Sequence, residues 1–465
     1  MQIDLDLKRC SASELVMPEV TPFAALRYNL DHIRSLSEVV APPYDVIDAD
    51  HQDVLYKRHP SNVIRVILNR EEPGDEIDET YSRASGFVKQ WIREGVLKQD
   101  DEPGFYLYHQ RFETDGTDGE VETVTRRGFM GRVRLEPFGK GNIHPHEETH
   151  PKAKVDRLKL LKATQQNNSP IFGLYPDDDN AVIECLEAAK DDVTPIEATD
   201  DAGVVHTVWP ITDPKAIEMA KQLLAGKPMF VADGHHRYET ACDYRDFVAE
   251  QAGGIAPDHP VNFVMTMLVG MNDPGLVVLP THRLIRGTRP LRSEELIERL
   301  GDQFDCETLS GGMSAAADAW TRIQLANCQG LMALYAAGDE TWVMANANEK
   351  AMARMSGLAG DQSETWRSLG VSLLHKLVLE DSLGETNHPK PTYVHEVRDV
   401  LAGLKGESQA AESEGDGQYT FAALVMPASV ADVEKISLNH ERMPAKSTYF
   451  YPKLLSGLAF HRLMP

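Results

Sequence analysis

An apolar run of strand type, Met229 to Ala232, ends in Asp233-Gly234, and a helical pattern follows at once. This order predicts a strand, a tight turn and the start of a helix. Gly234 can adopt a backbone conformation that other residues avoid, and Asp233 can cap the helix through its side chain. The stretch therefore predicts a strand–turn–helix unit around which the rest of the chain is organised.

The first turn of the expected helix carries His235, His236 and Arg237. Positive charges at a helix N-terminus oppose the helix dipole, each by roughly 0.3–1 kcal/mol. Their concentration there makes sense if an anion fills the site, because backbone N–H groups and a guanidinium at this position bind phosphate readily. We predict a phosphate site at 233–237. A capped surface helix with solvated side chains is the alternative.

The net charge of −25 limits the partners of the chain, since 47 lysine and arginine residues face 72 aspartate and glutamate residues. Such a field repels nucleic acid and anionic membrane surfaces at long range. The sequence also holds no basic block of the kind that binds DNA. We therefore expect neither nucleic acid nor a membrane as a partner, whereas a local basic pocket for a small anion is compatible with this charge.

The cysteines and the apolar segments indicate the cellular compartment of the protein. The five cysteines lie far apart and form no C-x-x-C pair, which argues against a disulfide framework or a zinc knuckle. The N-terminus lacks the apolar region of a signal peptide. The longest apolar stretch, around 261–279, is interrupted at 272–275 and predicts two strands and a turn rather than a membrane span. These features predict a cytoplasmic protein with reduced thiols.

Strands and helices alternate through the middle of the chain. Strands are expected at 169–175 and 204–209, and helices at 180–190 and 214–224, ahead of the strand at 229–232. This alternation predicts a mixed α/β fold, of the α/β or α+β kind.

Two further elements are expected in the N-terminal half. Runs at 104–112 and 121–135 predict paired strands joined by a turn at 115–119. The run 62–68 predicts a strand that contains Arg65. A buried arginine there would need a carboxylate or phosphate partner, and a half-exposed face is the alternative.

Asp45 is a candidate acidic residue. Two prolines fix an extended backbone directly before Tyr44-Asp45. A stiff loop could present Asp45 to a pocket, or the same loop could only pack Tyr44.

A second candidate stretch carries three histidines and two glutamates between His144 and His150. Its spacing lacks the helical i, i+4 arrangement of zinc proteases. Four interpretations remain open: a zinc site, Glu147 as a general base, a phosphate contact from His146, and a polar surface loop.

Near the C-terminus, Lys446-Ser447 is similar to the end of a phosphate-binding P-loop, but the glycines that such a loop needs are missing upstream. We therefore reject a P-loop. Lys446, Ser447, Thr448 and Lys453 could still close over an anion bound elsewhere. The alternative is a strand whose aromatic face packs on the core.

Several motifs together identify a family. They are A-P-P-Y-D-V-I (41–47), D-R-L-x-L-L (156–161), A-D-G-H-H-R-Y-E-T-A (232–241), P-T-H-R (280–283) and M-P-x-K-S-T-Y-F-Y-P-K-L-L-S-G-L (443–458). This combination resembles the prokaryotic family labelled "domain of unknown function 1015" over almost the whole chain. The label brings no assigned reaction.

The D-G-H-H-R segment is also similar to the signature of the ParB/sulfiredoxin-like nucleotide-binding fold, whose members include free-serine kinases. That resemblance implies a core of this fold and a phosphate cradle of Asp233, Gly234, His235, His236 and Arg237. The acidic base of the kinases aligns with no residue here, so Asp45 and Glu147 are candidates by chemistry alone. A histidine replaces the catalytic cysteine of sulfiredoxin, which argues against that reaction.

We expect four segments. Residues 1–290 would form the ParB/sulfiredoxin-like core with insertions, and 291–402 an accessory α/β region. The Gly/Ser/Glu-rich stretch 403–418 predicts a linker or loop. Residues 419–465 would pack back on the core.

The hypothesis that follows is a nucleotide-dependent small-molecule kinase. It would use ATP or ADP with Mg²⁺ to phosphorylate a hydroxylated metabolite such as free serine. His235 or His236 would donate to the developing charge, and Asp45 or Glu147 would take the hydroxyl proton or hold Mg²⁺. A nucleotide-binding switch without an acceptor and a phosphate-ester hydrolase are the alternatives.

Overall fold

The computed structural model describes residues 18–115, 121–149, 151–386, 390–407 and 418–464. The chain forms two compact units. Unit 1 comprises Met1–His144, Thr149–Leu276 and Pro452–Pro465, and unit 2 comprises Pro145–Glu148 and Val277–Tyr451. The bounds of these two units differ from those of the four segments expected from the sequence. The four-segment division remains a prediction.

Unit 1 is built on a mixed sheet in the strand order β6-β11-β8-β12-β5-β4-β10-β9, with β1 paired to β5. Its strands are β1 (Val20–Thr21), β4 (Phe105–Asp115), β5 (Val121–Arg134), β6 (Ile143–Pro145), β8 (Ile171–Tyr175), β9 (Ile196–Thr199), β10 (Val205–Ile211), β11 (Met229–Asp233) and β12 (Phe263–Gly270). The strands β8 and β12 run parallel, whereas β12 and β5 run antiparallel. All residues of β12 are buried, as expected of a continuous apolar run in a central strand.

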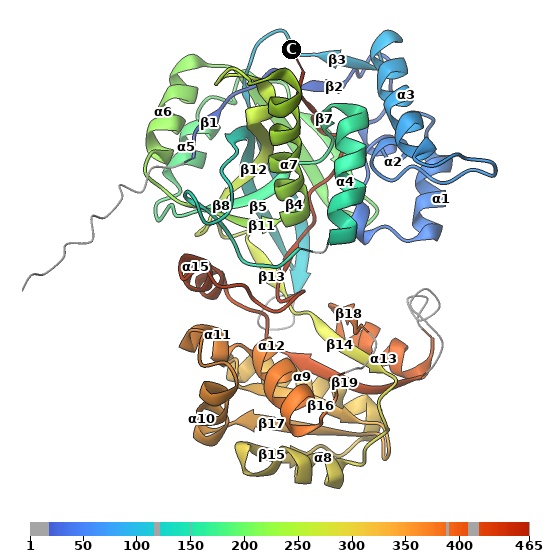
Figure 1. Cartoon of the computed structure of the whole chain (residues 1–465), viewed down its shortest axis with the longest axis vertical. Coiled ribbons are helices and arrows are strands. Elements are labelled where there is room, and N and C mark those ends of the chain that lie inside the picture. The colour runs from blue at the N-terminus through green and yellow to red at the C-terminus, as the bar shows by residue number, and fades with distance from the viewer. Residues whose placement is uncertain (1–17, 116–120, 150, 387–389, 408–417, 465) are drawn as a thin grey trace, which may run out of the picture. The chain divides into compact units, whose positions relative to one another are not determined.

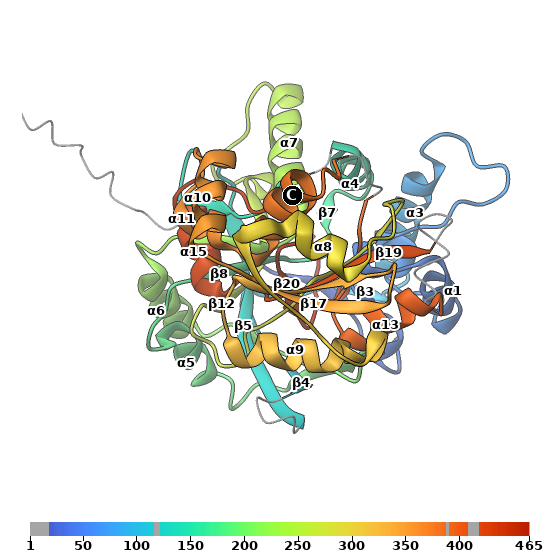
Figure 2. The same ribbon diagram turned by 90° about the horizontal axis from the view of Figure 1, so that it is seen from below.

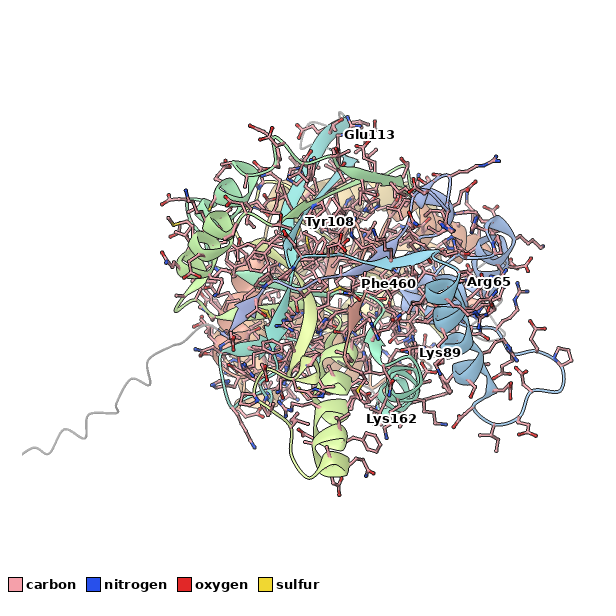
Figure 3. All side chains as sticks on the ribbon, turned by 90° about the horizontal axis from the view of Figure 1, so that it is seen from above. Arg65, Lys89, Tyr108, Glu113, Lys162 and Phe460 are labelled. Carbon is pink, nitrogen blue, oxygen red and sulfur yellow. The ribbon has the colours of Figure 1, made fainter. Side chains whose placement is uncertain are left out.

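The helices of unit 1 are α1 (Ala49–Arg58), α2 (Ile64–Ile67), α3 (Glu79–Arg93), α4 (Pro151–Thr164), α5 (Ala181–Glu187), α6 (Pro214–Leu224) and α7 (His235–Ala252). Figure 1 shows α4 and α7 side by side, and Lys162 of α4 lies 3.8 Å from the centre of the Phe247 ring of α7. Figure 3 labels Lys162. Side chains of α5, α6 and α7 share one apolar core with the sheet. Strands and helices thus form the mixed α/β fold that the sequence predicts.

The expected hairpin at 104–135 is confirmed. The strands β4 and β5 pair antiparallel from Tyr106 opposite Met130 to Asp115 opposite Val121. Tyr108, in the middle of β4 (Figure 3), is fully buried. The predicted turn at 115–119 lies largely outside the described residues.

The strand expected at 62–68 is wrong, because Ile64–Ile67 form the short helix α2. The Asn62 side chain accepts a hydrogen bond from the N–H of Ile64 and donates to the carbonyls of Glu38 and Val40. These bonds start the helix. Arg65, labelled in Figure 3, is half-buried over the ring of Tyr56.

Unit 2 holds a sheet in the order β15-β17-β16-β19-β14-β18 and the separate pair β13–β20. The strands are β13 (Val277–Leu279), β14 (His282–Arg286), β15 (Phe304–Thr308), β16 (Leu331–Ala336), β17 (Thr341–Ala347), β18 (Thr392–Val394), β19 (Tyr419–Val425) and β20 (Tyr449–Tyr451). Figure 2 shows α8 (Ser293–Leu300) and α9 (Ala316–Ala326) on opposite faces of this sheet. Trp342 and Met344 of β17 share a core with α9.

Unit 2 also contains several further helices. Its further helices are α10 (Glu349–Leu358), α11 (Glu364–Ser368), α12 (Gly370–Ser372), the π-helix η6 (Leu373–Ser382), α13 (Val397–Lys405) and α15 (Val430–Leu438). In no part of the chain that the structure describes is a helix both long and apolar enough to cross a bilayer.

Candidate functional site

The strand–turn–helix unit expected at 229–241 is confirmed. Strand β11 ends at Asp233, Gly234 has φ 93° and ψ 25°, and α7 begins at His235. A positive φ of this size favours glycine, because a Cβ atom would be strained there. Gly234, rather than Asp233, occupies the N-cap position.

The guanidinium of Arg237 lies directly over Gly234. A Cβ atom on Gly234 would come within 3.0 Å of Nη2 and 3.1 Å of Nε of Arg237. The guanidinium donates to Asp233 Oδ2 at 2.8 Å and to the carbonyl of Pro170. Glycine at 234 therefore serves both the turn and the position of Arg237.

Asp233 holds a second cation. The Nζ of Lys453 lies 3.2 Å from Asp233 Oδ1, and its side chain is only 15% exposed. Lys453 is held through its backbone, since its carbonyl accepts a hydrogen bond of 3.0 Å from Gln110 Nε2. The buried Arg126 donates to the neighbouring carbonyl of Pro452 and to Gln110. Two cations thus share one carboxylate at the start of α7.

A cavity of about 60 Å³ opens beside this cluster. Its polar lining includes Arg237, Arg157 and Tyr44, and the remainder comes from Ile67, Leu160, Leu161, Gln166, Asn167, Asn168, Ser169, Ile171, Thr240 and Val264. A water molecule needs about 10–15 Å³ of such space. The cavity therefore has room for a group of the size of a phosphate, but not for a whole nucleotide.

Arg157 and Tyr44 line the cavity together with Arg237. The Arg157 guanidinium lies 3.9 Å from the centre of the Tyr44 ring and donates to Asp156 and to the carbonyl of Ile67. Burial raises the pKa of the Tyr44 hydroxyl, Asp45 adds to the rise, and Arg157 and Arg237 oppose it. The loop expected to present Asp45 thus places Tyr44 in the cavity lining.

The other residues of unit 1 that the sequence predicts for the site do not line this cavity. Asp45 is exposed, and it does not belong to the cavity lining. His235 is buried in the first turn of α7, and the carbonyl of His236 accepts the Thr240 hydroxyl at 2.6 Å. The catalytic roles of Asp45, His235 and His236, and the phosphate contacts of residues 233–237, stay predictions.

Glu147, Lys446, Ser447 and Thr448 belong to unit 2. His146 Nε2 lies 2.8 Å from Thr448 Oγ1, and the Ser447 hydroxyl donates to the carbonyl of Pro444.

Lys446 has φ 59°, which is uncommon for a residue with a side chain, and its carbonyl accepts a 2.9 Å hydrogen bond from Arg283 Nη2. The predicted anion contacts of Lys446, Ser447 and Thr448 and the acid–base role of Glu147 remain predictions.

Metal ligation by Asp45 and Glu147 also remains a prediction. Among the residues that the structure describes, no group of three or more His, Cys, Asp and Glu side chains could hold a metal ion. His150, part of the histidine-rich stretch, lies outside the described residues. Mg²⁺ commonly takes one or two carboxylates together with phosphate oxygens, so it does not require such a group.

Sequence reasoning missed the position of Arg157 on the cavity. The D-R-L-x-L-L motif contains it, but the motif alone does not say which face of α4 meets a cavity. Arg126 and Gln110 were also missed, because they act on the backbone of residues 452–453, which lies more than 300 positions away.

Comparison with solved structures gives only weak similarity. A conserved hypothetical protein from Pyrococcus furiosus has 12% identity, covers 67% of this chain and 89% of its own, and has a TM-score of 0.30. A free serine kinase in complex with AMP has 11% identity, 66% and 83% coverage and a TM-score of 0.29. SbnI with a C-terminal truncation, from Staphylococcus aureus, has 11% identity, 70% and 85% coverage and a TM-score of 0.31. At these TM-scores the likeness supports no statement about activity, and the ParB/sulfiredoxin-like core stays a prediction.

The comparison with curated proteins gave no significant match. A family model described as "Protein of unknown function (DUF1015)" matches residues 20–372. This range covers more than half of the chain and includes the motifs at 41–47, 156–161, 232–241 and 280–283. The chain therefore belongs to the DUF1015 family.

Proposed function

We propose that unit 1 binds the phosphates of a nucleotide at the start of α7 and that the protein is a nucleotide-dependent small-molecule kinase. The observation that carries the proposal is the pair of arginines, Arg237 and Arg157, on one phosphate-sized cavity. Two guanidiniums beside a helix N-terminus suit an anion with several oxygens, since each can donate two parallel hydrogen bonds. The resemblance of D-G-H-H-R to free-serine kinases supports the same assignment.

Phosphoryl transfer depends mainly on positioning and on neutralising the charge of the transferred group. Arg237 is well suited to this, because Asp233 and the Pro170 carbonyl fix its guanidinium. Lys453, held on the same carboxylate of Asp233, adds a further cation beside Arg237. The base and sugar of the nucleotide would lie outside the cavity, since about 60 Å³ admits only a phosphate group.

Mg²⁺ would join the nucleotide as a cofactor that neutralises charge on the phosphate oxygens. In unit 1, Asp45 is the predicted carboxylate ligand, and its exposure leaves it accessible to a metal–nucleotide complex. ATP or ADP is the expected nucleotide, and a hydroxylated metabolite such as free serine is the expected acceptor.

A thermal-shift series with ATP, ADP, CTP and GTP, each with Mg²⁺, tests the nucleotide site. A ligand at about 100 times its dissociation constant adds roughly 2.7 kcal/mol to the unfolding free energy, which raises the melting temperature measurably. We expect this rise in the wild type and its loss in Arg237→Ala. Arg245→Ala is the matched control, because Arg245 also lies on α7 and also bonds one carboxylate and one carbonyl.

The same series separates the alternatives. No rise with any nucleotide would refute both the kinase and a nucleotide-binding switch. A rise without any phosphorylated product from serine or related hydroxy compounds would favour the switch. Release of phosphate from phosphoserine without added nucleotide would favour a phosphate-ester hydrolase.

A further inference from the structure

A second cavity of about 130 Å³ borders the first in unit 1. Ile67, Arg157 and Leu160 line both cavities. The remaining walls come from Val66 of α2, the chain after α2, the beginning of α3 and Asp156 of α4. The two cavities therefore adjoin at these three side chains. Group transfer would require these side chains to move aside, since the reacting atoms must approach to about 3–3.5 Å.

A carboxylate of fixed orientation lies in the wall of the second cavity. Asp156 Oδ1 accepts a 2.7 Å hydrogen bond from the Tyr81 hydroxyl, and Asp156 Oδ2 accepts one of 2.6 Å from Arg157 Nε. Burial and the Asp156 carboxylate both raise the pKa of Tyr81, so Tyr81 remains a donor. Nη2 of Arg157 also lies 2.5 Å from Asp156 Oδ2, so Oδ1 is the oxygen with a further lone pair that can accept a hydrogen bond from a ligand.

The charge of the lining is negative. Arg157 neutralises Asp156, whereas Glu71 has no ion-pair partner within the described part of the chain. The Thr80 hydroxyl adds a neutral hydrogen-bonding group. The second cavity thus combines an uncompensated carboxylate, hydroxyl groups and a buried apolar wall of Val66 and Ile67. This combination suits a small molecule that carries an ammonium group and a hydroxyl group.

We propose that this second cavity is the acceptor site for a small amino alcohol or hydroxy amino acid, with Glu71 near the ammonium group and Asp156 as the acceptor of the hydroxyl proton. The binding part stands on the cavity alone, and the transfer step rests on the proposed kinase function. In that step the acceptor oxygen bonds to the terminal phosphorus, and the bond from that phosphorus to the bridging oxygen breaks. The proton passes to Asp156, and the shortened nucleotide leaves.

Binding is tested by calorimetric titration of ethanolamine, L-serine and glycolate into the full chain, with and without ADP. We expect Glu71→Gln to lower the affinity for ethanolamine and L-serine by about two- to five-fold, as for a partly exposed ion pair. The affinity for glycolate should be unchanged. Glu72→Gln is the matched control, since it removes the same charge one residue away, outside the cavity lining. Equal effects of the two substitutions, or no binding of either ammonium compound to the wild type, would overturn the proposal.

The role of Asp156 is tested by kinetics. Asp156→Asn keeps the shape of the side chain but removes a general base, so we expect kcat at saturating nucleotide to fall by about 100-fold or more. Glu71→Gln should instead raise KM and leave kcat near its wild-type value. An unchanged kcat in Asp156→Asn would refute the base. Absence of nucleotide binding in the wild type would refute the proposed kinase function. The titrations would then decide separately whether the second cavity binds an ammonium compound.

Discussion

The ammonium group of Lys453 lies 3.2 Å from Oδ1 of Asp233, although the two residues are 220 positions apart. Asp233 Oδ2 accepts from Arg237 at 2.8 Å, so one carboxylate orients two cations. The side chains of Asp233 and Lys453 are 22% and 15% exposed. A half-buried carboxylate with two cations at the start of α7 is an arrangement suited to an anion site.

Replacing Lys453 by methionine removes this charge and keeps most of the side-chain volume. We expect Lys453→Met to weaken binding of ADP by about 10- to 100-fold, because a hydrogen bond to a charged group contributes roughly 1.5–3 kcal/mol. Isothermal titration measures the change. Lys227→Met is the control, since Lys227 pairs with the buried Asp177 at 2.7 Å away from the cavity lining. Equal losses of affinity in both variants would contradict a direct role of Lys453.

Alanine substitutions of the glycines at the two ends of α7 would distinguish the effect of backbone strain from the effect of displacing Arg237. Gly234 and Gly253 both have positive φ, but only a Cβ on Gly234 would meet the Arg237 guanidinium, whereas Gly253 has open space. We expect Gly253→Ala to cost about 1 kcal/mol of unfolding free energy from strain. Gly234→Ala should cost more and should also lower the affinity for nucleotide. Denaturant unfolding and titration of ADP check the two effects, and unchanged affinity in Gly234→Ala would show that Arg237 has room to move.

The strand–turn–helix unit could be predicted because its signals are local. The apolar run before Asp233 and the glycine at 234 act within a few residues of the structure that they determine. The cations around Asp233 could be predicted only in part. Arg237 follows within one helical turn, whereas Lys453 reaches Asp233 through the backbone contacts of Gln110 and Arg126, which no local pattern encodes.

The failed strand at 62–68 has a similar physical reason. Its β-branched residues suit either a strand or a buried helical turn, and periodicity does not separate the two over so short a run. The hydrogen bonds of Asn62 to the carbonyls of Glu38 and Val40 decide for the helix, and both carbonyls lie more than 20 positions upstream.

The stacked pair of Tyr44 and Arg157 predicts a difference between two substitutions. Tyr44→Phe keeps the ring under the guanidinium, so we expect wild-type affinity for ADP. Tyr44→Ala removes the ring, and we expect a loss of about two- to thirty-fold, which corresponds to a cation–π contribution of roughly 0.5–2 kcal/mol. Titration of ADP into both variants measures this. If Tyr44→Phe binds as weakly as Tyr44→Ala, the hydroxyl rather than the stack is what the site uses.

His282 links the stability of unit 2 to pH. The side chain is fully buried in β14, and burial, with Arg283 and His395 adding to it, lowers its pKa to about 3. The unfolded chain, with a histidine pKa near 6.5, then binds a proton between about pH 6.5 and pH 3 that the folded protein does not. The unfolding free energy therefore falls as the pH drops through this window, by about 1.4 kcal/mol per pH unit from this residue.

We expect His282→Asn to flatten this slope, because asparagine does not titrate and its side-chain oxygen can accept from the N–H of Val425 as Nδ1 does. Urea unfolding between pH 4 and pH 6 would measure the slope. His32→Gln, at an exposed histidine, controls for the loss of a histidine as such. If both variants keep the wild-type slope, His282 does not stay neutral in the folded protein through this range, and its buried ring must be protonated with a partner that stabilises the charge.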